Sequence, residues 1–245
     1  MDVAVKMPRL AFRDVSVRLG QKQALSGVSF EMQERRVAIV GRNGSGKTTL
    51  GRVIAGLQAP DSGQARVDGA DLARDRKTAL RSVGILFQNP DHQIIFPTVE
   101  EEIAFGLVQL GRSRDQAARE TAEILARFGK AHWAKAATHA LSQGQKQLVC
   151  LLSVLAMNPA LVVLDEPYSG LDIPTRLQLM RYVDGIAAHV VQITHDPQTV
   201  RDFDRVLWLD DGRIRRDGPA AAVLPEFERQ MRTWGGLDDL AHLAD

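Results

Sequence analysis

The sequence has a single cysteine, no excess of either charge and no long apolar run. The single cysteine, Cys150, excludes a disulfide framework and fits a protein of a reducing compartment. Its apolar neighbours predict that its side chain is buried. Lys and Arg total 31 against 30 Asp and Glu, so charge gives no reason to expect generic binding to nucleic acid or a membrane surface. The longest apolar run, Leu148–Met157, suits a buried helix, since a bilayer span needs about 20 residues. Met1–Leu10 lacks the pattern of a secretory signal, so we expect a cytoplasmic chain.

The spacing of apolar residues changes twice along the chain. Alternation or short buried runs predict strands in the opening and closing parts, at Leu10–Val17, Val28–Phe30, Val37–Val40, Gln64–Val67, Val83–Phe87, Leu161–Leu164 and Val190–Thr194. Helical spacing predicts helices, most of them in the middle, at Gly46–Leu57, Val99–Leu110, Arg114–Phe128 and Gln143–Met157. We therefore predict an α/β fold with an antiparallel β-region and a helical subdomain inserted at about residues 88–157. A single domain would span residues 1–235, followed by a weakly patterned tail at residues 236–245.

A glycine-rich segment follows the predicted buried strand Val37–Val40 and precedes a predicted helix. Its sequence, Gly41-Arg42-Asn43-Gly44-Ser45-Gly46-Lys47-Thr48, fits the phosphate-binding loop of P-loop NTPases. Glycines let backbone N–H groups turn toward a phosphate, and the helix that follows adds the positive end of its dipole. We expect Lys47 to reach the β- and γ-phosphates and Thr48 to bind Mg²⁺. Kinases, GTPases, helicases and transport ATPases share this loop, so it predicts nucleotide binding and leaves the function open.

Two further strands end in polar side chains that could meet the loop at one edge of a sheet. The strand Leu161–Leu164 is followed by Asp165 and Glu166. Asp165 is then the expected Mg²⁺ partner, and Glu166 is the candidate for polarising the attacking water. His195 directly follows the strand Val190–Thr194, so it could touch the γ-phosphate.

The segment Leu141-Ser142-Gln143-Gly144-Gln145, taken together with these motifs, resembles the signature of ATP-binding cassette (ABC) proteins. The resemblance implies a head-to-tail dimer in which Ser142 and Gly144 of one subunit contact the γ-phosphate held by the other. It also implies that Gln88 senses Mg²⁺ and the membrane partner, that Ser169-Gly170-Leu171-Asp172 contacts the second subunit, and that His195 is a switch histidine. Leu19 stands where many members place an aromatic side chain that stacks on adenine.

A narrower resemblance rests on Phe87-Gln88-Asn89-Pro90-Asp91-His92-Gln93-Ile94 and on Pro97-Thr98-Val99-Glu100-Glu101-Glu102-Ile103-Ala104-Phe105-Gly106. These segments are similar to the ATPases of energy-coupling factor (ECF) importers. That resemblance implies a second ATPase subunit, a transmembrane coupling protein and a small membrane protein that binds a vitamin or metal ion. It places the chain at the cytoplasmic face of the membrane, without nucleic acid as a partner.

Within this group the chain resembles the biotin-dedicated ATPases most, with the cobalt or nickel type next. Asn89–Thr98 is expected to contact the coupling protein, through Asp91, His92 and Gln93. An ABC ATPase that acts on nucleic acid remains the alternative from a different class.

The candidate site thus combines motif residues and residues carried over from the resemblance, with ATP and Mg²⁺ as cofactors. The proposed catalytic residues are Glu166, His195 and Lys47. The proposed nucleotide-binding residues are Gly41, Asn43, Gly44, Ser45, Gly46, Lys47, Thr48, Thr49, Gln88, Ser142, Gly144 and Gln145. The proposed metal ligands are Thr48, Gln88 and Asp165. The other histidines are interpreted as structural: His92, His132, His139, His189 and His242. The basic clusters Arg74–Lys77 and Arg213–Arg216 are interpreted as solvated surface.

Overall fold

Residues 9–235, which this computed structural model describes, form two sheets, and the larger one is mostly parallel. Its strand order is β10-β9-β3-β8-β7-β6. The strands are β3 (Arg36–Val40), β6 (Val83–Leu86), β7 (Leu161–Asp165), β8 (His189–Thr194), β9 (Arg205–Asp210) and β10 (Arg213–Gly218). Because β3, β7 and β8 pair in parallel, their carboxyl ends reach the same edge of the sheet, with Asp165 beside Ile193 and Val40 beside Thr194.

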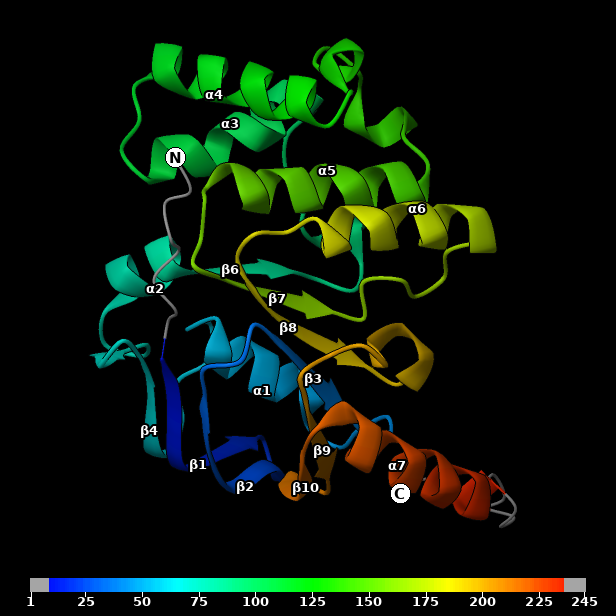
Figure 1. The fold of residues 1–245 in the computed structure, drawn as a ribbon. Helices are drawn as coiled ribbons and strands as arrows, with labels where there is room; N and C mark the ends of the chain where they lie inside the picture. The colour runs from blue at the N-terminus through cyan, green and yellow to red at the C-terminus, as the bar shows by residue number, and fades with distance from the viewer. Residues whose placement is uncertain (1–8, 236–245) are drawn as a thin grey trace.

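The second sheet is antiparallel and lies next to the first (Figure 1). Its order is β2-β1-β4-β5, with the strands β1 (Leu10–Leu19), β2 (Lys22–Met32), β4 (Ser62–Val67) and β5 (Ala70–Asp71). Phe12 of β1 pairs with Phe30 of β2 in register, and their rings stack with centroids 4.7 Å apart. The antiparallel pairing of β1 with β2 and β4 therefore confirms the predicted antiparallel β-region.

Helices fill the space between the sheets and cover the larger one. Helix α1 (Lys47–Ile54) lies between them, and its Leu50 and Ile54 share a core with residues of both sheets. Helix α7 (Ala220–Gly235) covers β9, where the ring of Phe227 meets the buried ring of Trp208 edge to face. Two further helices complete this part, α2 (Arg76–Ser82) and α6 (Ile173–Asp184).

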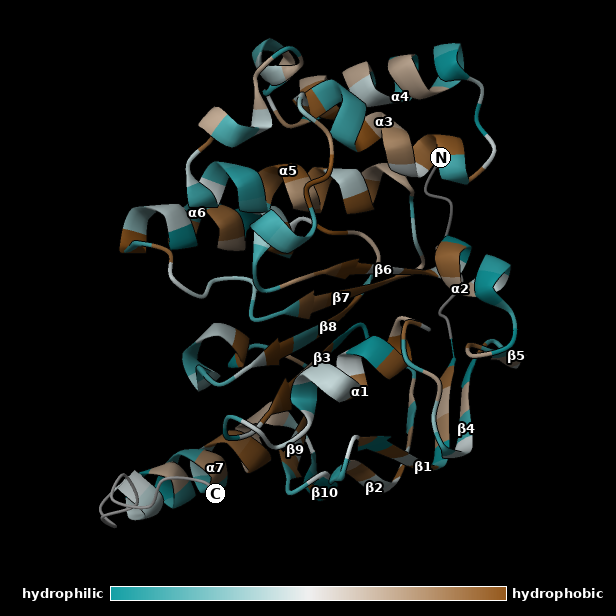
Figure 2. Ribbon diagram, turned by 180° about the vertical axis from the view of Figure 1, so that it is seen from behind, coloured by the Kyte–Doolittle hydropathy of each residue, from teal (hydrophilic) through white to brown (hydrophobic). Residues whose placement is uncertain are grey.

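The predicted helical region stacks over β6 and β7 (Figure 1). It contains α3 (Val99–Gln109), α4 (Arg114–Arg127), α5 (Gln143–Ala156) and the 3₁₀ turns η1 (Pro90–His92), η2 (Ala131–Trp133) and η3 (Thr138–Ala140). Helix α5 buries its apolar run against Val162 and Leu164 of β7 and Val190 of β8. Figure 2 shows the same relation, with hydrophobic strands β6, β7 and β8 beneath the helices. Cys150 is fully buried in this core, as predicted, and burial raises the pKa of its thiol.

The predicted elements all occur, with ends that differ by a few residues. The predicted helix Gly46–Leu57 is shorter in the structure, since α1 begins at Lys47 and ends at Ile54. The sequence analysis did not predict α2, β5, β9, β10 or α7, although the buried run of β9 carried a readable strand signal. The Lys and Arg side chains of the two basic clusters are exposed, the first just before and within α2 and the second on β10, as expected for solvated surface. His242 and the predicted tail lie outside the described residues. None of the helices between residues 9 and 235 has the length and apolarity needed to cross a membrane.

Candidate functional site

The glycine-rich loop connects β3 to α1 and is held in shape by close backbone contacts. Gly46 has φ 99°, and a Cβ there would lie 2.4 Å from the carbonyl oxygen of Ala24. A Cβ on Gly41 would lie 2.2 Å from the carbonyl oxygen of Leu209. Only glycine fits these two positions, because any Cβ would meet backbone that cannot move aside. Asn43 and Gly44 are exposed, whereas Ser45 is 4% exposed and its Oγ has no hydrogen-bond partner among the described residues.

Lys47 lies under the loop with its ammonium group turned toward it. The side chain is 6% exposed, and Nζ donates to the carbonyl oxygens of Gly41 at 2.7 Å and Arg42 at 2.8 Å. Burial lowers the pKa of this ammonium group, and the nearby carboxylates of Glu166 and Asp165 oppose the shift. A buried cation beneath a glycine-rich loop at the start of a helix is suited to bind a multiply charged anion.

Thr48 and Asp165 meet at the edge of the sheet as the sequence predicts. Thr48 Oγ1 donates to Asp165 Oδ1 at 3.3 Å, and Asp165 is 3% exposed. Burial raises the pKa of this carboxyl, and the hydrogen bond from Thr48 opposes the shift. Both residues line a cavity of about 740 Å³ together with Gln88, so the three proposed metal ligands face one space. Hydroxyl, carboxylate and amide oxygens are ligands that Mg²⁺ accepts, and it usually takes few protein ligands beside phosphate and water.

Glu166 and His195 form a pair at the same edge. His195 Nδ1 lies 2.8 Å from Glu166 Oε1, and Thr194 Oγ1 donates to Glu166 Oε2 at 3.4 Å. Glu166 is 9% exposed and has φ 47°, a left-handed backbone conformation that is costly for any residue other than glycine. Its N–H donates to the carbonyl oxygen of Ile193 at 2.9 Å, so the adjoining strand holds this backbone in place. Such local strain in the backbone is common at functional sites.

The signature segment begins α5, and its side chains are engaged in the start of that helix. Ser142 is the N-cap, and its Oγ accepts from the N–H of Gln145 at 3.3 Å. In return, Gln145 Oε1 accepts from the N–H of Ser142 at 2.8 Å, which completes a capping box. A Cβ on Gly144 would lie 2.2 Å from Thr175 Cγ2 of α6, so close packing of the two helices requires glycine there. A nucleotide-binding role for Ser142, Gly144 and Gln145 stays a prediction.

The cavity lined by Thr48 and Asp165 contains some of the predicted site residues of one chain and lacks others. Gln88 and Gln143 line it, whereas Ser142 and Gly144 are not among its lining residues. Besides Gln143, the lining includes further residues that are not among the predicted site residues: Arg52, Phe87, Asn89, Asp91, His92, Ser169 and Gly170. Arg52 follows Thr48 by one helical turn, so helical periodicity could have indicated it. Thr49 is buried inside α1.

The remaining histidines differ in their surroundings. His189 is 4% exposed and its Nδ1 lies 3.0 Å from the carbonyl oxygen of Glu34, which confirms the structural role predicted for it. His92 lines the cavity, and His132 and His139 are exposed, so their roles stay predictions. No group of three or more His, Cys, Asp or Glu side chains arranged to hold a metal occurs in the part of the chain that the structure describes. A metal here would therefore need oxygen ligands of other kinds, as Thr48 and Gln88 provide.

Comparison with known proteins confirms the resemblance. A family profile described as ABC transporter matches residues 25–169, more than half of the chain. The biotin transport ATP-binding protein BioM of Rhodobacter capsulatus is 51% identical over 207 residues, which cover 84% of this chain and 88% of that protein. The energy-coupling factor transporter ATP-binding protein EcfA1 of Lacticaseibacillus paracasei is 36% identical over 89% of this chain and 80% of its own length.

Solved structures of ATP-binding cassettes share the fold. A dimeric, post-hydrolysis structure of the cassette MJ0796 bound to ADP and Pi superposes with a TM-score of 0.76. It is 26% identical and covers 86% of this chain and 98% of its own. The glycine-rich loop, the signature segment and the pair of Asp165 and Glu166 all fall within the residues that the family profile matches. The chain is therefore an ATP-hydrolysing, ATP-binding protein of the ABC transporter family.

Proposed function

We propose that this chain energises an ECF-type importer of biotin from the cytoplasmic face of the membrane. The observation that carries the proposal is the 51% identity to a biotin transport ATPase over 84% of the chain. A cobalt or nickel importer of the same type is the alternative solute class. Co-expression with the transmembrane coupling protein and the small substrate-binding membrane protein, followed by purification and mass spectrometry of the bound solute, tests the choice. Biotin in the purified complex supports the proposal, and a metal ion in its place contradicts it.

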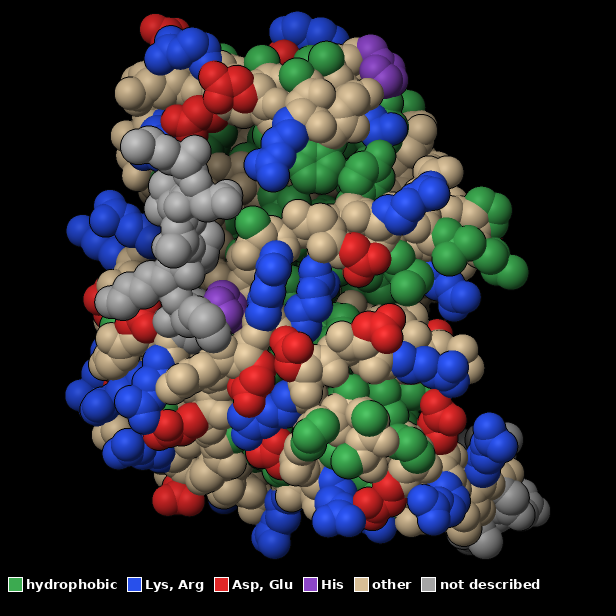
Figure 3. Space-filling view, viewed as in Figure 1, with side chains coloured by type: hydrophobic (Ala, Val, Ile, Leu, Met, Phe, Trp, Pro, Cys, Tyr) green, Lys and Arg blue, Asp and Glu red, His purple; other side chains and the backbone are tan. Residues whose placement is uncertain are grey.

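An ABC ATPase that acts on nucleic acid has less support from the surface. Figure 3 shows Lys and Arg side chains interspersed with Asp and Glu over the face that it draws, without a broad basic area. Proteins that track a phosphate backbone usually present a continuous basic surface. ATPase activity that rises with DNA or RNA, and not with membrane partners, would favour the alternative.

The site geometry suggests a role for each charged side chain in hydrolysis. Lys47 would neutralise the triphosphate, because its buried ammonium lies directly beneath the loop. Glu166 would orient and polarise the attacking water, and His195 would hold that carboxylate and sense the γ-phosphate. Thr48, Gln88 and Asp165 would hold Mg²⁺, which supplies charge neutralisation of the phosphoryl oxygens.

A second copy of the chain would complete the site. Ser142 and Gly144 do not line the cavity that contains Thr48 and Asp165 within one chain. The positive end of α5, which starts at this segment, could instead face the phosphates held by a second subunit. The dimeric cassette of similar fold supports this arrangement, and we propose a homodimer.

The adenine base should be discriminated weakly. Leu19, at the end of β1, is 45% exposed and has no aromatic ring to stack on a base. We expect ATP and GTP to compete within about tenfold, a gap of about 1.4 kcal/mol. Competition binding on the wild type measures this ratio, and Leu19→Tyr should raise the preference for ATP. A much larger preference in the wild type would show that another residue reads the base.

An apolar groove between the sheet layer and the helical region fits a helix of the membrane partner. The groove has a volume of about 520 Å³ and is lined by residues of the sheet layer and of the helical region. Its exposed apolar side chains are Leu57 and Leu80 on one side and Ile95 and Phe105 on the other. Gln93 also lines the groove, and its Oε1 accepts from the N–H of Phe87 at 3.1 Å. Phe87 directly precedes Gln88 of the site. Phe87 lines the groove as well, so movement at Gln88 would reach the groove through the adjacent residue.

Asp91 and His92 lie beside this groove and not among its lining residues. Asp91 forms an ion pair with Lys146 of α5, with the charged atoms 2.7 Å apart. Asp91 also borders a cavity of about 320 Å³ with Ile94 and Pro97, and it lines the cavity that contains Thr48 and Asp165. The predicted contact of Asp91 with a coupling protein therefore involves a carboxylate already paired within the chain.

Charge reversal at Asp91 tests the coupling role. We expect Asp91→Lys to disrupt assembly with the membrane partner or solute uptake, because it places a repelling charge at the docking edge. ATP binding by the isolated subunit should persist, since Asp91 lines the cavity of Thr48 and Asp165 but lies outside the phosphate loop and pairs with Lys146. Pull-down, uptake and ATP affinity are the measurements.

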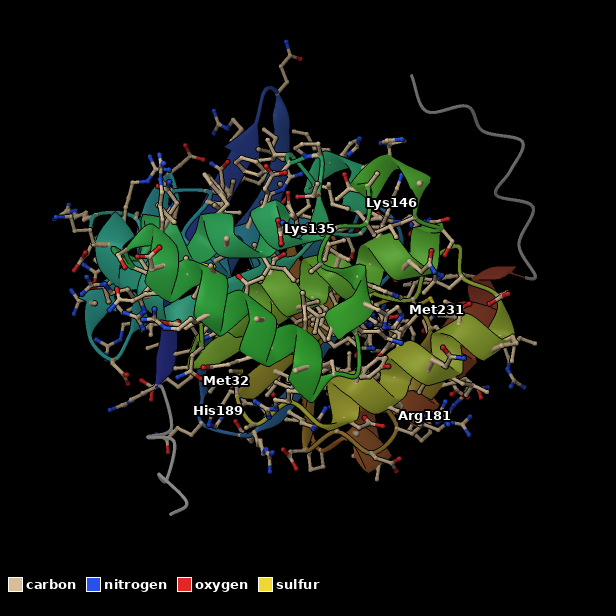
Figure 4. All side chains as sticks on the ribbon, turned by 90° about the horizontal axis from the view of Figure 1, so that it is seen from above. Met32, Lys135, Lys146, Arg181, His189 and Met231 are labelled. Carbon is tan, nitrogen blue, oxygen red and sulfur yellow. The ribbon has the colours of Figure 1, made fainter. Side chains whose placement is uncertain are left out.

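The ion pair with Lys146, labelled in Figure 4, offers a matched control. The double variant Asp91→Lys with Lys146→Asp restores an internal pair but keeps the reversed charge at position 91. Loss of uptake in both variants supports a direct contact with the partner. Uptake that persists in the single variant, or returns in the double variant, contradicts it.

A further inference from the structure

The last turn of α7 touches the phosphate loop through an aromatic ring. The guanidinium of Arg42, the second residue of the loop, lies over the ring of Trp234 with its carbon 4.6 Å from the centroid. Arg215 of β10 lies 5.5 Å from the same ring and 4.5 Å from the ring of Trp208. Trp234 is half-buried, whereas Arg42 and Asn43 of the loop are exposed.

The position of α7 does not depend on Trp234 alone. Val223, Leu224 and Phe227 are buried against Val206 and Trp208 of β9. Arg215 also donates to Gln230 of α7 at 3.3 Å, and Arg216 donates to Glu226 at 2.8 Å. The contacts of the earlier turns therefore fix the position of α7, and they place Trp234 next to the loop independently of its own ring.

We propose that Trp234 is a positioning residue for ATP binding, acting by holding Arg42 and with it the exposed start of the phosphate loop. The carbonyl oxygen of Arg42 accepts from Lys47 Nζ and from the N–H of Ser45, so it is the exposed side chain of Arg42 that the ring of Trp234 can hold. A guanidinium stacked on a ring loses much of its rotamer freedom before any ligand arrives. The side chain of Arg42 then loses less freedom when the triphosphate binds, and its charge stays beside the loop.

Substitution of Trp234 should weaken nucleotide binding without changing the chemical step. We expect Trp234→Ala to raise the Kd for the non-hydrolysable analogue AMP-PNP with Mg²⁺ by about two- to fivefold. Turnover at saturating ATP should stay within about twofold of wild type, because the contact is made equally in the ground and transition states. Trp234→Phe keeps a ring under Arg42 and should restore most of the affinity.

Met231, labelled in Figure 4, provides a matched control on the same helix. It packs against the core beneath α7, as Trp234 does, but has no aromatic ring to offer the guanidinium of Arg42. Met231→Ala should lower the melting temperature with little change in the Kd. Equal weakening by Met231→Ala, or an unchanged Kd in Trp234→Ala, overturns the proposal.

Two further measurements show whether Trp234 acts through Arg42. The double variant Trp234→Ala with Arg42→Ala should bind AMP-PNP no more weakly than Arg42→Ala alone, whereas additive losses would overturn the proposal. The chain has three tryptophans, so subtracting the Trp234→Phe emission spectrum from that of the wild type isolates Trp234. We expect this difference spectrum to change when AMP-PNP binds, and an unchanged spectrum would also overturn the proposal.

Discussion

Replacing Glu166 with glutamine is expected to reduce turnover by about 10²–10⁴-fold, while ATP affinity stays within about twofold of wild type. Glutamine has the volume of glutamate but cannot polarise a water as a carboxylate does. The loop, Lys47 and the Thr48–Asp165 contact do not involve this carboxylate directly, so the binding residues remain in place. Single-turnover hydrolysis and equilibrium binding on the purified chain measure the two quantities. ATP should also trap the variant as a dimer, which size-exclusion chromatography detects.

Two comparisons make the assignment of Glu166 specific. Asp165→Asn should weaken Mg²⁺-dependent binding as well as turnover, because Asp165 faces Thr48 and the proposed metal. His195→Ala should lower turnover and leave binding intact, since Nδ1 contacts the Glu166 carboxylate. Hydrolysis at the wild-type rate in Glu166→Gln would remove Glu166 from the catalytic role.

Gly46→Ala is expected to destabilise the fold by about 2–4 kcal/mol and to lower ATP affinity by about tenfold or more. The first part of the cost is the left-handed conformation, with φ 99°. The second part is steric, because the new Cβ would lie 2.4 Å from the carbonyl oxygen of Ala24. Relief of that contact must move the loop, and the N–H groups that face the phosphates move with it. Denaturant unfolding and equilibrium nucleotide binding are the measurements.

Gly111 separates the two costs. It has φ 92°, close to that of Gly46, but a Cβ there would meet nothing within 4 Å. Gly111→Ala should therefore show only the conformational cost, about 1–2 kcal/mol, with nucleotide binding unchanged. If both variants lose stability equally and keep their affinity for ATP, the contact with Ala24 does not shape the loop.

The predictable part of the site is the part that is local in sequence. The loop could be placed between a buried strand and a helix because its motif and its flanking elements are contiguous. Asp165, Glu166 and His195 could be placed together because the carboxyl ends of parallel strands share an edge. The capping box of Ser142 and Gln145 was also readable, since residues three apart at a helix start carry that signal.

Other features could not be predicted because they join residues that no local pattern connects. The left-handed conformation of Glu166 depends on its bond to β8, and the apolar groove needs the helical region to lie beside α2. Strand β10 carries no clear apolar alternation, and a strand signal such as that of β9 does not show which helix packs on it, as α7 does here.

The sequence by itself determined the α/β class, the phosphate loop, the acidic pair and the membership of the chain in the ABC family, because each rests on neighbouring residues. Only the tertiary structure decided which faces meet. It placed Gln88 and Gln143 on one cavity with Asp165, paired Asp91 with Lys146, and brought Trp234 from the end of the described chain onto Arg42. Apolar periodicity reports which face of an element is buried, but the partner of that face is chosen by the packing of the whole chain.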